Sequence, residues 1–189
     1  MGLNFYPPSP RYVTPDLAAA LAAETPREVC KVGLFVDVDD DDLGAVLDAV
    51  PLDLLQLHGD ETIERVAALR KRFGLPVMKA IRVSGPDDIA LASAFAEVSD
   101  WLLFDARAPA DMKGALPGGN ALSFDWRLIA GQSWAVPWML SGGLGVGNVA
   151  EAVSVSGARL VDVSSGIEDR RGHKSPAMIT DFLARVAGL

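Results

Sequence analysis

The sequence has little of what secreted, membrane-spanning or nucleic-acid-binding proteins rely on. Cys30 is the single cysteine among 189 residues, which excludes an internal disulfide framework and fits the reducing cytoplasm. No apolar run reaches the roughly 20 residues of a membrane helix, and the first residues lack the basic and apolar regions of a signal peptide. With 17 Lys and Arg against 25 Asp and Glu, the net charge is −8, which disfavours nucleic acid or an anionic membrane as a partner.

Half of the residues are hydrophobic, which is enough to build one domain with a substantial core over residues 1–189. Short aliphatic runs alternate with helical patterns along the whole chain. The predicted strands are Leu3–Tyr6, Cys30–Val36, Leu52–Leu57, Val77–Val83, Trp101–Asp105, Pro137–Ser141 and Arg159–Val163. The predicted helices are Asp16–Glu24, Leu43–Val50, Glu61–Phe73, Pro86–Val98, Phe124–Ile129, Gly147–Ser154 and Ser175–Val186. This alternation predicts an α/β protein with a parallel sheet.

The position of the glycines favours a barrel over a doubly wound dinucleotide-binding sheet. A dinucleotide fold needs a Gly-x-Gly-x-x-Gly turn after its first strand, whereas Pro7-Pro8-Ser9-Pro10-Arg11 stands there. Glycines gather instead after the last two predicted strands, where barrels commonly bind phosphate. We therefore expect a (βα)8 TIM barrel. Seven strands are predicted rather than eight, so we expect the chain to be N-terminally incomplete, without the first βα unit of about 25 residues.

Two local patterns at helix starts have a structural interpretation. The acidic run Asp39–Asp42 is open to interpretation as a metal site, but a solvated helix N-terminus, stabilised by the helix dipole, is the better explanation. Asp60 is expected to cap the helix Glu61–Phe73, which Gly74 then ends.

Polar residues at the carboxyl ends of barrel strands are candidates for function, because the βα loops there form the active site of this fold. The candidates are Arg11, Gln56, His58, Asp105 and Asp162, with the clusters Gly142-Gly143 and Ser164-Ser165-Gly166. Each has a structural alternative: a helix cap for Asp105, a loop-ordering backbone contact for His58, a surface ion pair for Arg11, and plain turns for the glycines. Lys79, in mid-strand, must be paired or snorkel, and we assign it no role.

Seven motifs occur in an order that resembles one enzyme family. They are Ser9-Pro10-Arg11-Tyr12, Val32–Val36, Leu55–Glu61, Leu102–Asp105, Phe124-Asp125-Trp126, Leu140–Leu144 and Asp162–Glu168. From about Leu3 to Phe182 they resemble phosphoribosylanthranilate isomerase, the (βα)8 enzyme of tryptophan biosynthesis. Each motif is weak by itself, whereas seven in register point to this family.

The resemblance implies a reaction and roles for the candidates. The reaction is an Amadori rearrangement of N-(5′-phosphoribosyl)anthranilate to 1-(2-carboxyphenylamino)-1-deoxyribulose 5-phosphate, with no metal and no organic cofactor. Asp105 matches the general acid that protonates the furanose ring oxygen, and Arg11 matches the arginine that meets the anthranilate carboxylate. The other residues expected to bind this phosphosugar are His58, Asp162, Gly142, Gly143, Ser164, Ser165 and Gly166. The chain is expected to be a monomer or a homodimer.

The sequence departs from the family pattern in two places. Asn120-Ala121 stands where Thr-Gly or a similar pair is usual. The family's general base is a cysteine in a Lys-x-Cys-Gly motif on the first barrel strand, and this sequence has no such motif. Cys30 is no substitute, because it opens a strand and six residues place it roughly 20 Å from the catalytic rim. We expect it to be a buried, inert side chain.

Two alternative functions stay open. Another phosphosugar barrel enzyme is one of them, but an epimerase would need metal-ligating His and Asp residues on several strands, and indole-glycerol-phosphate synthase would need catalytic lysines. The second alternative is a catalytically inactive phosphosugar-binding barrel that keeps the phosphate site and lacks the base.

Overall fold

A computed structural model describes residues 1–109 and 111–189. The strands are β1 (Gly2–Asn4), β2 (Val32–Phe35), β3 (Leu54–Leu57), β4 (Val77–Val83), β5 (Trp101–Ala106), β6 (Trp138–Leu140), β7 (Glu168–Arg170) and β8 (His173–Lys174). The α-helices are α1 (Pro15–Glu24), α2 (Asp40–Ala49), α3 (Ile63–Phe73), α4 (Pro86–Ala96), α5 (Val149–Ser156) and α6 (Pro176–Ala187), with short 3₁₀ turns η1 (Trp126–Leu128) and η2 (Ser165–Ile167). None of these helices is long and apolar enough to cross a bilayer.

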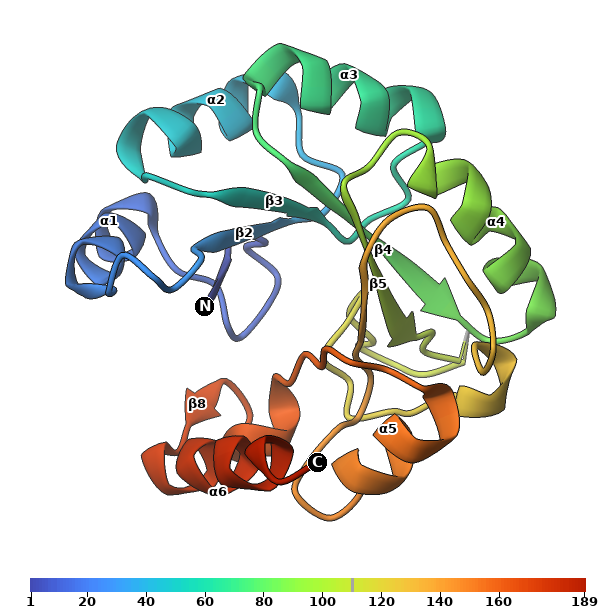
Figure 1. The fold of residues 1–189 in the computed structure, drawn as a ribbon. Coiled ribbons are helices and arrows are strands. Elements are labelled where there is room, and N and C mark those ends of the chain that lie inside the picture. The colour runs from blue at the N-terminus through green and yellow to red at the C-terminus, as the bar shows by residue number, and fades with distance from the viewer. Residues whose placement is uncertain (110) are drawn as a thin grey trace.

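The first six strands form one parallel sheet in the order β1-β2-β3-β4-β5-β6. Each strand thus pairs with its neighbour in sequence, as in a barrel, and Figure 1 shows helices α1 to α5 in an arc around the outside of the strands. The fold is a partial (βα) barrel. The remaining strands, β7 and β8, form a separate antiparallel hairpin before α6.

The prediction of a seventh strand at Arg159–Val163 is wrong. Val161 forms an isolated parallel bridge with Leu140, through bonds from Leu140 N to Leu160 O at 3.0 Å and from Asp162 N to Leu140 O at 2.8 Å. In the part of the chain that the structure describes, no strand pairs with the other side of this segment, and the outer edge of β1 carries an isolated bridge from Asn4 to Tyr12. The pairing is limited to this one bridged residue, which is too short to count as a strand.

The helix boundaries follow from local chemistry. Thr14 accepts a hydrogen bond from Leu17 N ahead of Pro15, as expected of a cap before an N-terminal proline. The cap of α3 is Thr62, whose hydroxyl accepts from Arg65 N, and not Asp60 as predicted, because the Asp60 carboxylate pairs with Arg82 instead. The acidic run proves to be a helix start, since Asp39 caps α2 and Asp40 to Asp42 form its first turn.

Side chains alternate between the inside of the curved sheet and the helices. Leu54, Met78, Ala80 and Leu103 form the buried interior cluster, while neighbouring residues of the same strands pack under the helices. By this parity Gln56 and Asp105 point inward at the carboxyl ends of β3 and β5, where a barrel carries its site.

The prediction for Cys30 is wrong in one respect. The residue is exposed rather than buried, because strand pairing begins only at Val32. Its position is as expected, before β2 at the amino end of the sheet, where its carbonyl accepts a hydrogen bond from the N-terminal amine.

Candidate active site

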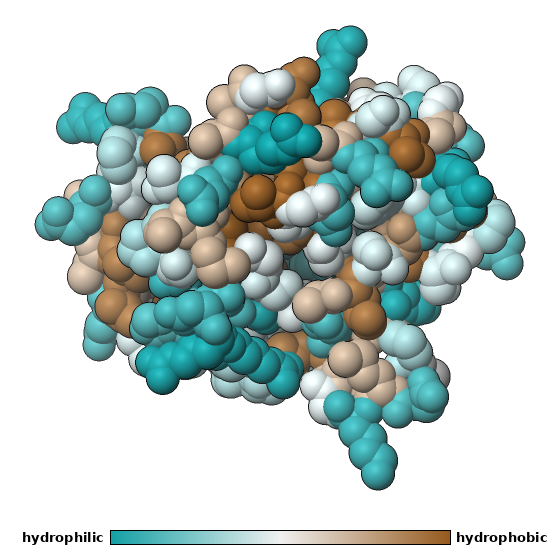
Figure 2. Space-filling model, turned by 90° about the horizontal axis from the view of Figure 1, so that it is seen from below, coloured by the Kyte–Doolittle hydropathy of each residue, from teal (hydrophilic) through white to brown (hydrophobic). Residues whose placement is uncertain are grey.

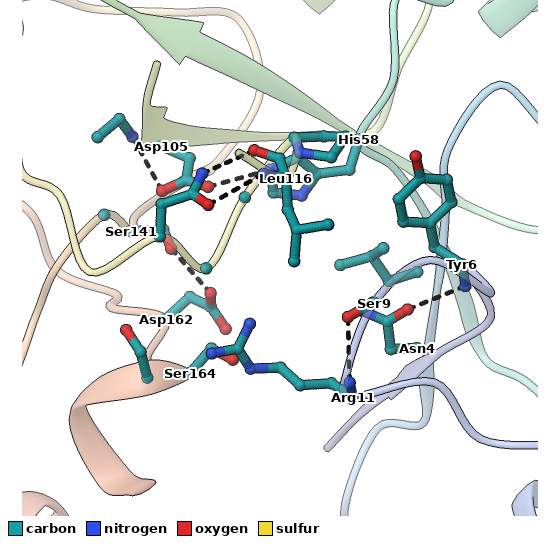
Figure 3. A pocket seen from close by; sticks show the side chains of 18 of the residues that line it. Asn4, Tyr6, Ser9, Arg11, His58, Asp105, Leu116, Ser141, Asp162 and Ser164 are labelled. Atoms are coloured by element: carbon teal, nitrogen blue, oxygen red, sulfur yellow. Dashed lines mark hydrogen bonds and ion pairs between the residues drawn. The ribbon is translucent and has the colours of Figure 1, made fainter. Parts of the chain in front are cut away.

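A pocket opens at the carboxyl ends of the parallel strands. Residues from the loops after β1, β3, β5 and β6 line it, and Figure 3 shows Arg11, His58, Asp105, Ser141 and Asp162 around one space. The predicted site residues that line the pocket are Arg11, His58, Asp105, Gly142, Gly143, Asp162, Ser164 and Ser165. Gly166 lies behind the lining, where an added Cβ would come within 1.9 Å of Leu144 O.

An imidazole and a carboxylate form the centre of the pocket. His58 Nε2 lies 3.0 Å from Asp105 Oδ2, and both residues are buried. Gln56 Nε2 lies 3.0 Å from His58 Nδ1. Because the Gln56 amide nitrogen is a donor, His58 Nδ1 accepts this bond, and the ring proton is on Nε2, which donates to Asp105. The His58 ring therefore bonds two side chains, unlike the backbone contact considered above. Asp105 Oδ1 accepts from Ala106 N at 2.9 Å.

A second carboxylate, Asp162, lies beside Ser141 in the same pocket. Asp162 Oδ2 accepts a hydrogen bond from Ser141 Oγ at 2.9 Å. Burial raises the pKa of Asp162, and the nearby charge of Asp105 adds to this effect, while Ser141 opposes it. Gln56 was a candidate without an assigned role, and Ser141 was not a candidate. The available signal for Ser141 was its position at the end of the predicted strand Pro137–Ser141.

Arg11 is held by a carboxylate from the far end of the chain. Its Nε and Nη2 donate to Glu168 Oε1 and Oε2 at 2.7 and 2.9 Å. Glu168 is buried at its side chain, 3% exposed, so the pair is not the surface ion pair considered above. Burial opposes ionisation of Glu168, but hydrogen bonds from Arg11, Lys174 and Gly172 N outweigh it and lower its pKa to about 2.

The glycines after β6 form a tight backbone wall. Gly143 has φ of +60°, and an added Cβ would lie 2.7 Å from Leu122 C. Only glycine fits such a left-handed, crowded position. Ser164 and Ser165 line the same end of the pocket, and Lys174 Nζ donates to Ser164 O at 2.7 Å. Backbone amides beside a lysine are suited to an anion such as phosphate.

A loop after β5 closes over the centre. An added Cβ on Gly118 would lie 2.6 Å from His58 Nε2 and 2.7 Å from Asp105 Oδ2. An added Cβ on Gly119 would lie 2.4 Å from Arg11 Nη1. Asn120, at the departure from the family pattern, ties the loop by bonding both N and O of Leu116. Gly118 thus covers the imidazole–carboxylate pair, and Gly119 lies against the Arg11 guanidinium.

The fold and the pocket together define a (βα)-barrel enzyme whose site gathers acid–base groups at the carboxyl ends of the strands. The family model for N-(5′-phosphoribosyl)anthranilate isomerase matches residues 1–185. This chain belongs to that family.

Individual relatives match the whole of this chain over most of their own length. The N-(5′-phosphoribosyl)anthranilate isomerase of Rhodospirillum centenum is 59% identical over 189 residues, which are 100% of this chain and 88% of that protein. The one from Paramagnetospirillum magneticum is 56% identical over 100% of this chain and 86% of its own. The crystal structure of the enzyme from Thermotoga maritima has 34% identity and a TM-score of 0.84, covering 100% of this chain and 87% of that chain.

A related solved structure holds a ligand. It is phosphoribosyl anthranilate isomerase in complex with reduced 1-(o-carboxyphenylamino)-1-deoxyribulose 5-phosphate, with 33% identity and a TM-score of 0.80 over 100% of this chain and 87% of that chain.

Proposed function

We propose that this pocket performs the reaction after which the family is named, in tryptophan biosynthesis. N-(5′-phosphoribosyl)anthranilate is converted to 1-(2-carboxyphenylamino)-1-deoxyribulose 5-phosphate. The observation that carries the proposal is the Asp105 carboxyl, held by His58 at 3.0 Å between Arg11 and the glycine wall that line the same pocket. The reaction moves protons and breaks one C–O bond without a net change of oxidation state, so its chemistry requires no redox cofactor.

Asp105 acts as the general acid in this proposal. Its proton passes to the furanose ring oxygen as the C1–O bond breaks, while the nitrogen lone pair forms the C=N bond of a protonated Schiff base. Hydrogen bonds from His58 Nε2 and Ala106 N stabilise the carboxylate that forms. Such donors lower the barrier because they bond more strongly to the developing charge than to the neutral acid.

The remaining groups orient the substrate. Arg11 Nη1, not used in the bonds to Glu168, is directed at the loop that covers the pocket and is suited to the anthranilate carboxylate. The wall formed by Gly142, Gly143, Ser164 and Ser165 receives the phosphate. Asp162 lies near the sugar carbons, where its raised pKa favours a carboxyl that exchanges protons with the substrate.

Loss of the C2 proton from the Schiff base requires a base, and no thiol lines the described part of the pocket. This observation supports the second candidate, a barrel that binds the phosphosugar with little turnover unless a strand with the family's cysteine completes it. We also propose that residues 1–189 form a single domain acting in the cytoplasm as a monomer or homodimer.

Asp105→Asn tests the proposed acid. It is compared with Asp100→Asn, the same change at the amino end of β5, in a chain extended at its N-terminus by a strand with a Lys-x-Cys-Gly motif. Asp105→Asn is expected to lower kcat about 10²–10⁴-fold and to leave the affinity for the reduced product analogue nearly unchanged. Near-normal kcat in Asp105→Asn would show that Asp105 is structural. Binding without turnover in the extended parent chain would favour the second candidate.

A further inference from the structure

A buried ion pair lies on the helix side of the sheet, behind the active site. Lys79 in β4 and Glu61 in the β3–α3 turn are 3% and 6% exposed, with 2.7 Å between Lys79 Nζ and Glu61 Oε2. The Lys79 ammonium also lies 5.6 Å from the centre of the Phe95 ring. Neither ionisable group touches the pocket that holds Asp105, and the proposed mechanism uses neither.

Stability does not explain why charges occupy this position. A buried ion pair is often no more stabilising than apolar side chains of the same volume, and the neighbouring Val77 and Ile81 on the same face of β4 are apolar and buried. Burial lowers the pKa of Lys79, whereas the negative charge of Glu61 acts to raise it. What distinguishes the pair from an apolar one is the set of hydrogen bonds that it makes.

Those bonds go to the backbone on both sides of His58. Lys79 Nζ donates to Gly59 O at 2.8 Å and to Leu57 O at 3.4 Å. Glu61 Oε1 accepts from Gly59 N at 3.1 Å. The pair thus holds the residue before His58 and the residue after it, from the side of the backbone opposite to the imidazole.

The same carboxylate ties in the neighbouring turn. Glu61 Oε1 also accepts from Asp37 N at 3.0 Å, and Asp60 N donates to Asp37 Oδ1 at 2.7 Å. An added Cβ on Gly59 would lie 2.4 Å from that oxygen, so the two turns are in close contact. The backbone that carries His58 therefore has little freedom to shift.

We propose that the Lys79–Glu61 pair positions His58 against Asp105, and that both are positioning residues for the acid step. The inference rests on the proposed function of Asp105. Without the pair, the 57–59 backbone relaxes and the His58 ring loses its single orientation. A displacement of about 1 Å at a reacting group can cost on the order of 10²-fold in rate.

Nuclear magnetic resonance of the histidine rings tests the positioning directly. The sequence contains two histidines, and exposed His173 serves as an internal reference. The double variant Lys79→Met/Glu61→Gln removes both charges together, so neither is left unpaired. Its matched control is Arg70→Met/Asp100→Asn, which removes the ion pair between α3 and Asp100 at the other end of the sheet.

The extended parent chain is expected to show one His58 tautomer with the proton on Nε2. In Lys79→Met/Glu61→Gln the ¹⁵N signals of His58 should broaden or move toward a tautomer mixture, while those of His173 stay in place. The control should leave both rings unchanged. If the double variant does not fold, Lys79→Met/Glu61→Leu carries the test, because it removes the same backbone bonds and replaces both charged groups by apolar side chains of similar volume.

Turnover in the extended chain gives the second readout. Lys79→Met/Glu61→Gln should lower kcat about 10- to 100-fold, with KM within about twofold, and the control should change neither. If Lys79→Met/Glu61→Gln, or Lys79→Met/Glu61→Leu where it carries the test, folds and shows parental His58 signals, the inference is overturned, whatever the role of Asp105. Displaced His58 signals with unchanged kcat would confirm that the pair positions His58. They would count against the acid step, because turnover would then not depend on how His58 is placed against Asp105.

Discussion

Arg11 and Glu168, 157 residues apart in sequence, form a two-bond ion pair across the open side of the sheet. Arg11 follows β1, and Glu168 begins the β7–β8 hairpin. The same loops touch at Pro10 and Gly172, where an added Cβ on Gly172 would lie 2.6 Å from Pro10 O. Loops therefore join the two ends of the sheet at its catalytic rim, where strands do not.

Glu168→Gln is expected to destabilise the protein in a pH-dependent manner. The pKa of Glu168 is lowered from 4.5 to about 2, so the stabilisation from its charge is fully present above pH ~4.5 and is lost as the pH falls through about 2. In urea unfolding, the variant should have a lower free energy of unfolding than the parent chain at pH 7, and this deficit should become smaller toward pH 2. Asp169→Asn, an exposed neighbour paired with His173, should show a much smaller deficit. A deficit of the same size at pH 7 and pH 2 contradicts this account.

Gly143→Ala is expected to weaken phosphate binding. The residue has φ of +60° and no room for a Cβ, so alanine must displace the backbone wall, at about 1–3 kcal/mol of strain. Inhibition by inorganic phosphate should require a concentration at least about tenfold higher, as 1.4 kcal/mol is a factor of ten. Gly145→Ala in the same loop, whose added Cβ would meet its nearest atom at 3.9 Å, should bind normally. Equal phosphate affinity in the two variants would show that this loop does not bind the phosphate.

Asp162→Asn is expected to stabilise the protein near neutral pH while it impairs activity. Burial raises the pKa of Asp162, and the charge of Asp105 adds to this, so ionisation at pH 7 costs folding free energy. That cost is absent below the unfolded-state pKa near 3.8 and grows as the pH rises toward the folded-state pKa. Thermal unfolding should give the variant a higher Tm at pH 7 and a smaller advantage at pH 3. A lower Tm at pH 7 would mean that the lost bond to Ser141 outweighs the removed charge.

An added parallel strand is expected to complete the sheet between β1 and Val161. Within the described residues, no strand pairs with the outer edge of β1 or with the free edge of the segment around Val161. Leu160, in that segment, is 41% exposed. The free N–H and C=O groups at these strand edges offer hydrogen bonds to a partner backbone. Figure 2 shows apolar and polar residues interspersed on the face seen from below.

The measurement compares the chain with and without an N-terminal segment carrying Lys-x-Cys-Gly. The unextended chain should be inactive and associate through its edges, as sedimentation would show, and the extended chain should fold cooperatively and turn over substrate. A segment with serine in place of the cysteine should restore folding without activity. A monomeric, active 189-residue chain would show that another residue supplies the base.

The strands of the sheet were predictable because their apolar runs are long enough to stand out. Val77–Val83 agrees at both ends, and Trp101–Asp105 differs by one residue. Arg159–Val163 has a similar composition, yet its pairing with the sheet is limited to one bridge, between Val161 and Leu140, and it does not form a strand. Strand propensity describes a local preference, whereas a strand exists only where neighbouring backbone completes its hydrogen bonds.

The sequence by itself determined the order of strands and helices, the end of the sheet at which polar residues gather, and the glycines that demand a left-handed or crowded backbone. These features depend on residues close together in the chain. Tertiary structure decided that Gln56 orients His58 toward Asp105, that Arg11 bonds buried Glu168, and that Lys79 pairs with Glu61. Such pairings form only between side chains that the fold brings within about 3 Å of each other in a region of low dielectric. The number of residues between two side chains in the sequence does not determine that distance.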